Sequence, residues 1–249
     1  MKERGDIMNP FKTGPALMKV FGTAKKFNKS IPKLQALRES GDIVAEKELI
    51  WKASGEWAVE TSEKLGVKYE ISGEENIPKS GPVMVYANHQ GLADILAIYY
   101  LFRNHFQIGF ISKDEWRKLK PLADAIEYTR SVFLVREDPR EAIKVIGEAS
   151  ELTANGFSLA IFPEGTRSHS HEMADFKPGS FKFAERAKVP ILPITLDGSY
   201  KMFEETGNFK PGQTIKITVH PLVHIENMSR QEQKNAASII ETTIREGLD

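Results

Sequence analysis

Cysteine is absent from the 249 residues of the chain. This absence excludes disulfide bonds, thiol nucleophiles and thiolate metal sites together, and it agrees with a reducing compartment. Long apolar runs are also missing, because no segment approaches the roughly 18 apolar residues of a membrane-spanning helix. The N-terminus has neither the apolar core nor the cleavage site of a signal peptide. We therefore expect a protein that stays in the cytoplasm.

The chain has no net charge, because 34 Lys and Arg residues balance 34 Asp and Glu residues. The charges are unevenly distributed, however, since residues 1–38 contain nine basic and only two acidic side chains. Apolar residues recur in this segment at steps of three and four, which is the period of one helical face. They are Leu17, Val20, Phe21, Ala24, Phe27 and Ile31.

A helix with an apolar stripe and a lysine-rich face is typical of segments that lie on an anionic membrane surface. We predict that residues 11–33 make such a contact; the alternative is a helix packed on its own domain with its lysines in solvent. Pro32 ends the pattern, and a second helix is expected from about Asp42 to Leu65. Residues 1–65 are thus predicted to form a two-helix appendage for membrane association.

From residue 66 to residue 249, short β-rich runs alternate with helical stretches, which indicates an α/β domain. We expect a mixed, largely parallel central sheet flanked by helices. The expected strands are 67–71, 83–87, 108–111, 132–135, 158–162, 191–196 and 214–220. The expected helices are 93–103, 139–155, 179–187 and 230–247, and Gly156 is a suitable stop after the second of them.

Two polar side chains follow the strand expected at 83–87. His89 and Asp94 are five residues apart, a spacing that would place them about 140° apart on one regular helix. They meet if His89 lies at or before the helix start and Asp94 lies in the first turns. A carboxylate then fixes the imidazole tautomer and stabilises its cation, as a general base for a hydroxyl group requires. The alternative is a capped helix with a packed histidine.

A second polar group, Phe-Pro-Glu-Gly-Thr-Arg-Ser at 162–168, follows the strand expected at 158–162. Its glycine lets backbone amides approach a ligand, and Arg167 offers a bidentate fork for a phosphate. A local ion pair between Glu164 and Arg167 is the alternative. Arg136 lies just beyond another strand, at the end where open α/β sheets bind ligands.

Other site classes lack an essential residue. The phosphate-loop frame at 207–212 is followed by Gln213 instead of lysine, and no Gly-x-Ser-x-Gly elbow supplies a serine nucleophile. His169 and His171 lie in a polar loop without a clear third ligand, so no metal site is expected there. The run Val-Pro-Ile-Leu-Pro-Ile at 189–194 fits a core strand as well as an acyl-chain wall.

Taken in order, the motifs at 89–94, 136, 162–168 and 189–194 resemble those of the glycerolipid acyltransferases. They are most similar to the 1-acyl-sn-glycerol-3-phosphate acyltransferases, because the glycerol-3-phosphate acyltransferases tend to read Glu-Gly-Gly-Arg in the second motif. The resemblance covers about residues 67–222 and does not reach the N-terminal segment. Two residues depart from the family pattern: Gly91 stands where many members have serine, and Ser131 where glycine is frequent.

The resemblance implies that His89 is the general base and Asp94 its orienting partner. It implies an acceptor site formed by Lys113, Arg136, Glu164, Gly165, Thr166 and Arg167. The reaction would move a fatty acyl group from acyl-CoA or acyl carrier protein to the 2-hydroxyl of 1-acyl-glycerol-3-phosphate, without a cofactor, a metal or a covalent intermediate. Donors for the oxyanion are expected among the backbone amides near His89 or at Gly165.

The expected partners are lysophosphatidic acid, the acyl donor and an anionic membrane surface met through residues 11–33, with no nucleic acid. The expected location is the cytoplasmic face of the cell membrane, as a peripheral or monotopic protein. Three alternatives remain open: an acyltransferase for another lyso-lipid, a thioesterase, and a non-catalytic peripheral lipid-binding protein. The complete His89, Asp94 and 164–167 set argues against the last, since a pure lipid binder needs none of that geometry.

Overall fold

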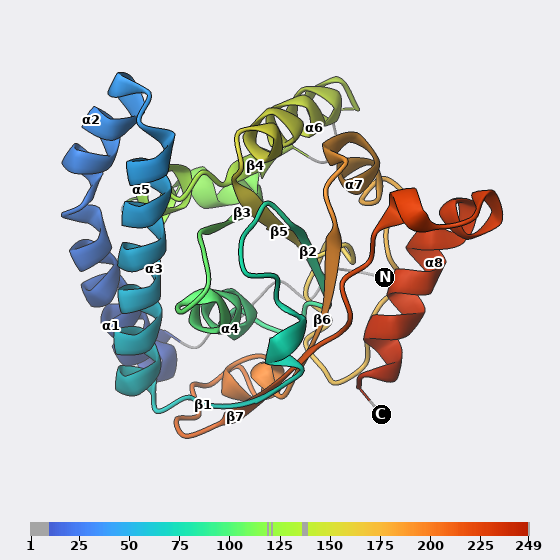
Figure 1. Cartoon of the computed structure of the whole chain (residues 1–249). Coiled ribbons are helices and arrows are strands. Elements are labelled where there is room, and N and C mark those ends of the chain that lie inside the picture. The colour runs from blue at the N-terminus through green and yellow to red at the C-terminus, as the bar shows by residue number, and fades with distance from the viewer. Residues whose placement is uncertain (1–9, 119, 121, 136–138, 249) are drawn as a thin grey trace.

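The computed structural model describes residues 10–118, 120, 122–135 and 139–248 (Figure 1). Its centre is a seven-stranded sheet in the order β1-β7-β6-β2-β5-β3-β4. Neighbouring strands are parallel except for β6 and β7, which are antiparallel. The mixed, largely parallel sheet predicted from the sequence is therefore confirmed. Its strands are β1 (Lys68–Ser72), β2 (Met84–Ala87), β3 (Ile108–Lys113), β4 (Val132–Leu134), β5 (Ser158–Ile161), β6 (Ile191–Asp197) and β7 (Thr214–Val219).

The central strand β2 is buried on both faces of the sheet. Because successive side chains of a strand point to opposite faces, Val85 packs in one apolar core and Met84 and Tyr86 pack in the other. Helix α4 (Ala93–Phe102) and the N-terminal helices cover the first face. Helices α6 (Pro139–Ala154), α7 (Lys182–Ala187) and α8 (Arg230–Glu246) cover the second.

The N-terminal segment contains three helices, which lie together on the left of Figure 1: α1 (Pro10–Asn28), α2 (Ile31–Ser40) and α3 (Ile43–Leu65). The two expected helices are present, and α2 is an additional helix between them. Pro32 lies in the first turn of α2, where the missing proline N–H removes no intrahelical hydrogen bond. Pro32 therefore ends the α1 pattern and also begins a helix.

The apolar face predicted for α1 is packed on the protein itself. Ala24 and Phe27 are buried, and the hydroxyl of Thr61 on α3 donates a 2.8 Å hydrogen bond to buried Thr23. This is the packing expected for the alternative in which the lysines of α1 face solvent. None of the described helices is both long and apolar enough to cross a membrane.

A buried ion cluster joins the N-terminal helices to the sheet. Glu46 of α3 is 1% exposed and accepts hydrogen bonds from Arg130 at 2.8 and 2.7 Å and from Arg38 at 2.9 Å. Arg130 precedes β4, and its guanidinium carbon lies 5.1 Å from the ring centroid of Phe157 beside β5. The N-terminal helices are thus anchored to the α/β part of the chain, whereas the domain boundary between residues 65 and 66 stays a prediction.

Candidate active site

The motif residues lie where four adjacent strands end at one edge of the sheet. Strands β6, β2, β5 and β3 are consecutive neighbours and all parallel, so their carboxyl ends share this edge. His89 follows β2, the 162–168 loop follows β5, and Lys113 is the last residue of β3. The topology therefore brings together side chains that are far apart in the sequence.

His89 lies in the segment 88–92 between β2 and α4, which we call the His89 turn. Its Nδ1 is 2.8 Å from Oδ2 of Asp94, which belongs to the first turn of α4. The same carboxylate oxygen accepts a hydrogen bond of 2.8 Å from the N–H of Gly91. Because Asp94 binds Nδ1–H, the neutral tautomer presents the Nε2 lone pair as a base. The hydrogen bond predicted from the five-residue spacing is therefore present, although the helix begins four residues after the histidine.

The surroundings of His89 favour its neutral form. Its ring stacks on Phe162 with the ring centroids 4.0 Å apart, and the side chain is 14% exposed. Burial lowers the pKa of His89, and the charges of Arg167 and Lys113 lower it further, whereas Asp94 acts in the opposite direction. A neutral imidazole near pH 7 suits removal of a proton from a hydroxyl group.

Glu164 supports the His89 turn from the side of β5. Its carboxylate is fully buried and accepts hydrogen bonds from the N–H of His89 at 2.5 Å and from the N–H of Ala174 at 2.8 Å. Burial raises the pKa of Glu164 to about 7, against the effect of these two donors. The structure thus gives Glu164 a supporting contact that the sequence did not predict, in addition to its place in the expected acceptor motif.

Arg167 is paired with a residue that the sequence did not single out. Its Nη1 lies 2.9 Å from Oε1 of Glu204, 37 residues further along the chain, whereas the alternative considered for this motif was a local ion pair with Glu164. Gly165 adopts a φ of +77°, a backbone conformation that favours glycine, and Thr166 is exposed. Arg136, a predicted phosphate ligand, lies outside the described residues.

Several backbone amides expected as oxyanion donors already donate within the protein. The N–H groups of His89, Gly91 and Leu92 bind the carboxylates of Glu164, Asp94 and Glu204. The N–H of Gly165 binds the carbonyl of Phe162 at 3.0 Å. These four amides are therefore engaged in holding the site together.

Two further polar residues of the His89 turn bind the neighbouring strand β6. The amide of Asn88 both donates to and accepts from the backbone of Leu196, at 2.8 and 2.7 Å, so it extends the ladder between β2 and β6. Gln90 accepts a hydrogen bond from the N–H of Gly198 and donates to Asp197. Asn88 is a polar residue directly after the apolar run of β2, and this position is the sequence feature that could have identified it.

One histidine of the 169–171 loop is engaged by a carboxylate at the end of β6. His171 binds Asp197, with Nδ1 and Oδ1 2.9 Å apart, and its side chain is half exposed. Among the described residues, no three His, Asp or Glu side chains are grouped so that they could hold a metal ion.

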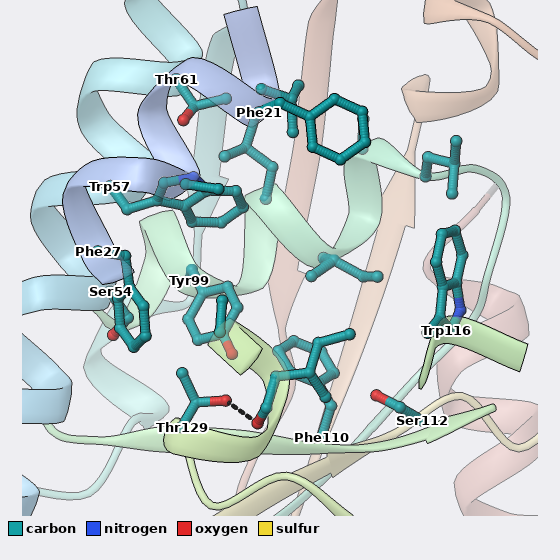
Figure 2. A pocket seen from close by; sticks show the side chains of 18 of the residues that line it. Phe21, Phe27, Ser54, Trp57, Thr61, Tyr99, Phe110, Ser112, Trp116 and Thr129 are labelled. Atoms are coloured by element: carbon teal, nitrogen blue, oxygen red, sulfur yellow. Dashed lines mark hydrogen bonds between the residues drawn. The ribbon is translucent and has the colours of Figure 1, made fainter. Parts of the chain in front are cut away.

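An apolar cavity of about 430 Å³ adjoins the His89 turn, within the size range of ligand pockets (Figure 2). It lies between the N-terminal helices, α4, α5 (Leu122–Tyr128) and β3, and Leu92 and Ala93 line it. Its wall is continuous with the ring under His89, because Phe110 lines the cavity and stacks on Phe162 with the centroids 5.9 Å apart. Figure 2 shows Trp57 and Tyr99 on one side of this space and Trp116 across from them.

Comparison with known proteins identifies the class to which this fold and site belong. The model of the Acyltransferase family matches residues 68–197, the segment that contains the His89 turn and the 162–168 loop. The chain belongs to the acyltransferase family, and it is an acyl-transferring enzyme.

Curated relatives of the chain are named 1-acyl-sn-glycerol-3-phosphate acyltransferases. The enzyme of Borreliella burgdorferi is 32% identical over 184 residues, which cover 74% of this chain and 73% of that protein. The enzyme of Chlamydomonas reinhardtii is 36% identical over 156 residues, which cover 61% of this chain and 46% of that protein. The family resemblance predicted from the motifs is thus confirmed.

A solved structure shows the same fold. The crystal structure of the 1-acyl-sn-glycerophosphate acyltransferase PlsC from Thermotoga maritima superposes with a TM-score of 0.68 at 24% identity. The match covers 93% of this chain and 96% of that chain, so the likeness includes most of the N-terminal helices.

Proposed function

We propose that the protein transfers a fatty acyl group from a thioester donor to the 2-hydroxyl of 1-acylglycerol 3-phosphate. The observation that carries this proposal is the His89–Asp94 pair, which lies beside two cations and an apolar cavity. The lysophosphatidic acid acceptor carries a hydroxyl, a phosphate and an acyl chain, and the site offers a partner for each. The names of the relatives support the same acceptor.

In the proposed mechanism, Nε2 of His89 removes the proton of the 2-hydroxyl, and the resulting oxygen attacks the thioester carbonyl. The tetrahedral intermediate then collapses to the ester, and the departing thiolate takes the proton from His89. Asp94 stabilises the imidazolium between these two steps, because its carboxylate remains bonded to Nδ1. A covalent acyl-enzyme is not needed, and the chain contains no cysteine that could form one.

The cations provide the acceptor phosphate with its partners. Arg167 and Lys113 both lie close enough to His89 to lower its pKa, so a phosphate between them would hold the glycerol near Nε2. The apolar cavity is proposed to hold an acyl chain, because its lining is almost entirely hydrocarbon and aromatic. The donor, either acyl-CoA or acyl carrier protein, is expected to approach at the same sheet edge, on the cytoplasmic face of the membrane.

We predict that His89→Ala and His89→Gln lower the rate of acyl transfer by about 10²–10⁴-fold, the usual contribution of a general base. The measurement is transfer of a radiolabelled acyl group to lysophosphatidic acid by purified protein whose fold is checked by circular dichroism. His224→Gln is the matched control, since His224 is exposed and pairs with Glu226 on another part of the surface. A folded His89→Ala protein with near-normal transfer would refute the role of His89.

We predict that Arg167→Ala raises the acceptor KM by about 10–100-fold, because a charge-assisted hydrogen bond contributes about 1.5–3 kcal/mol. The donor KM should change much less. Equal changes in the two constants would contradict phosphate binding by Arg167.

An acceptor panel of lyso-lipids, with free fatty acid release measured alongside, separates this function from acylation of another headgroup and from thioester hydrolysis.

A further inference from the structure

Glu204 binds two loops of the site, the His89 turn after β2 and the 162–168 loop after β5. It follows β6 and the short helix η3 (Ser199–Met202), and its side chain is 2% exposed. Its Oε1 accepts hydrogen bonds of 2.9 Å from the N–H of Leu92 and from Nη1 of Arg167. One buried carboxylate oxygen thus holds both the His89 turn and the arginine of the 162–168 loop.

The glycine at position 91 makes room for this carboxylate. A Cβ atom on Gly91 would lie 2.6 Å from Oε2 of Glu204 and 2.9 Å from its Cδ, distances that real Cβ contacts do not reach. Oε2 has no hydrogen-bond partner among the described residues and is buried. The carboxylate therefore fits against the bare backbone of Gly91, and a Cβ atom there would require the end of the Glu204 side chain to shift.

Arginine has many rotamers, and fixing them when a ligand binds costs conformational entropy. A buried carboxylate that holds one edge of the guanidinium fixes these rotamers during folding, before the acceptor arrives. The negative charge of Glu204 also weakens the attraction of Arg167 for an anion. The contact between Glu204 and Arg167 therefore contributes a fixed geometry, because a phosphate bound to Arg167 then occupies one position relative to His89.

We propose that Glu204 is the positioning residue of Arg167, and that Gly91 and Glu204 act as one unit in placing the acceptor phosphate. This inference rests on the proposed function, because it takes the ligand of Arg167 to be the phosphate of the acceptor. In this chain, the space beside residue 91 is filled by the carboxylate of Glu204.

The unit makes a specific prediction for paired substitutions. Gly91→Ala should displace the flexible end of Glu204 and weaken acceptor binding by about tenfold, because the three atoms nearest to a Cβ at residue 91 all belong to the Glu204 carboxylate. Glu204→Ala should have a similar effect. The double variant should bind no more weakly than Glu204→Ala alone, because the added methyl group then meets no carboxylate.

The experiment measures binding of a short-chain lysophosphatidic acid to the full chain by calorimetry, without an acyl donor. Glu205→Ala is the matched control, because Glu205 is adjacent in sequence, exposed and paired with Lys210. The corresponding monoacylglycerol, which lacks the phosphate, tests whether the loss is specific to the phosphate. Glu204→Gln retains an oxygen for Leu92 and Arg167 and should keep most of the affinity. If Glu204→Ala does not fold, the two single variants Glu204→Gln and Gly91→Ala test the positioning role of Glu204.

Additive effects of the two substitutions would overturn the inference, and so would equal losses for the two ligands. Wild-type protein that does not bind the phosphate ligand would overturn it as well. Wild-type protein that binds this ligand but transfers no acyl group to it would instead refute the proposed function, and the coupling between Gly91 and Glu204 would still be measurable.

Discussion

Three buried carboxylates define the site at the scale of single residues. Asp94, Glu164 and Glu204 each accept a hydrogen bond from a backbone N–H of the His89 turn. Buried carboxylates around an imidazole raise its pKa, yet the pKa of His89 is lowered, because desolvation is the largest effect and two cations add to it. The turn is thus held by three carboxyl groups, while burial favours the neutral form of its histidine.

This balance predicts the pH dependence of the reaction. A lowered pKa means that His89 stays neutral below the ordinary value of about 6.5, so the acid limb of kcat/KM should lie below pH 6.5. Lys113→Met removes one of the charges that lower the pKa and should move this limb to higher pH. The measurement is kcat/KM against pH for both proteins; a wild-type limb above pH 6.5, or an unchanged limb in the variant, would contradict the prediction.

The sequence predicted the residues whose relation is local and missed those whose partners are distant. The spacing of His89 and Asp94 restricts them to a turn and the following helix, and the structure has that arrangement. Glu204 lies 37 residues after Arg167, and its contacts with Arg167 and Gly91 arise only in the folded chain. Such a contact depends on the order of strands in the sheet, which no spacing in the sequence states.

The same distinction holds at the scale of helices and strands. Central strands such as β2 were predictable because burial on both faces produces a short apolar run between turn signals. Strand β7 was predictable because its apolar and polar residues alternate. Helix α5 has seven residues, too few to display a helical period, and it was not predicted. Helix α2 differs from the prediction, in which Pro32 is only a stop, because proline also occurs in the first turn of helices.

The ion cluster at Glu46 is predicted to anchor the N-terminal helices. Glu46→Ala leaves two partly buried arginines without this carboxylate, so the free energy of unfolding should fall by about 3 kcal/mol, the low end of the range for a broken buried pair. Urea denaturation followed by circular dichroism measures the change. The control is Glu48→Ala, because Glu48 is an exposed residue on the same helix, and this substitution should change the free energy of unfolding by less than about 0.5 kcal/mol. An equal effect of both variants would refute the anchoring role.

For the whole molecule, the N-terminal helices connect the site to its expected surroundings. Val20, Phe21, Ala24 and Phe27 of α1 line the apolar cavity, so the stripe that indicated a membrane helix is turned toward the interior. The outer face of α1 remains basic, and Met18 on it is 69% exposed. A membrane contact through this segment would therefore be mainly electrostatic, with its lysines facing the anionic lipid.

This arrangement predicts that α1 binds membranes through exposed lysines and not through its apolar stripe. Replacing Lys25 and Lys26 of α1 and Lys29 directly after it with Gln should weaken binding to anionic vesicles by up to about 100-fold, since each basic residue near the surface contributes about 1 kcal/mol. Co-sedimentation with phosphatidylglycerol vesicles at low and high salt measures this, and the loss should disappear at high salt because the interaction is screened. These substitutions leave the cavity lining in place, whereas deletion of residues 1–33 would remove part of it.

The matched control replaces three lysines around α7, which covers the opposite face of the sheet: Lys177, Lys182 and Lys188. The net charge of the two triple variants is the same, so a difference between them reports the position of the charges on the molecule. Equal weakening by both would show that only total charge matters, and unchanged binding of the α1 variant would show that α1 does not face the membrane. Weakening by the α1 variant alone would place the opening of the site toward the lipid that holds its acceptor, because α1, which carries two of these lysines and is followed directly by the third, also forms one wall of the cavity.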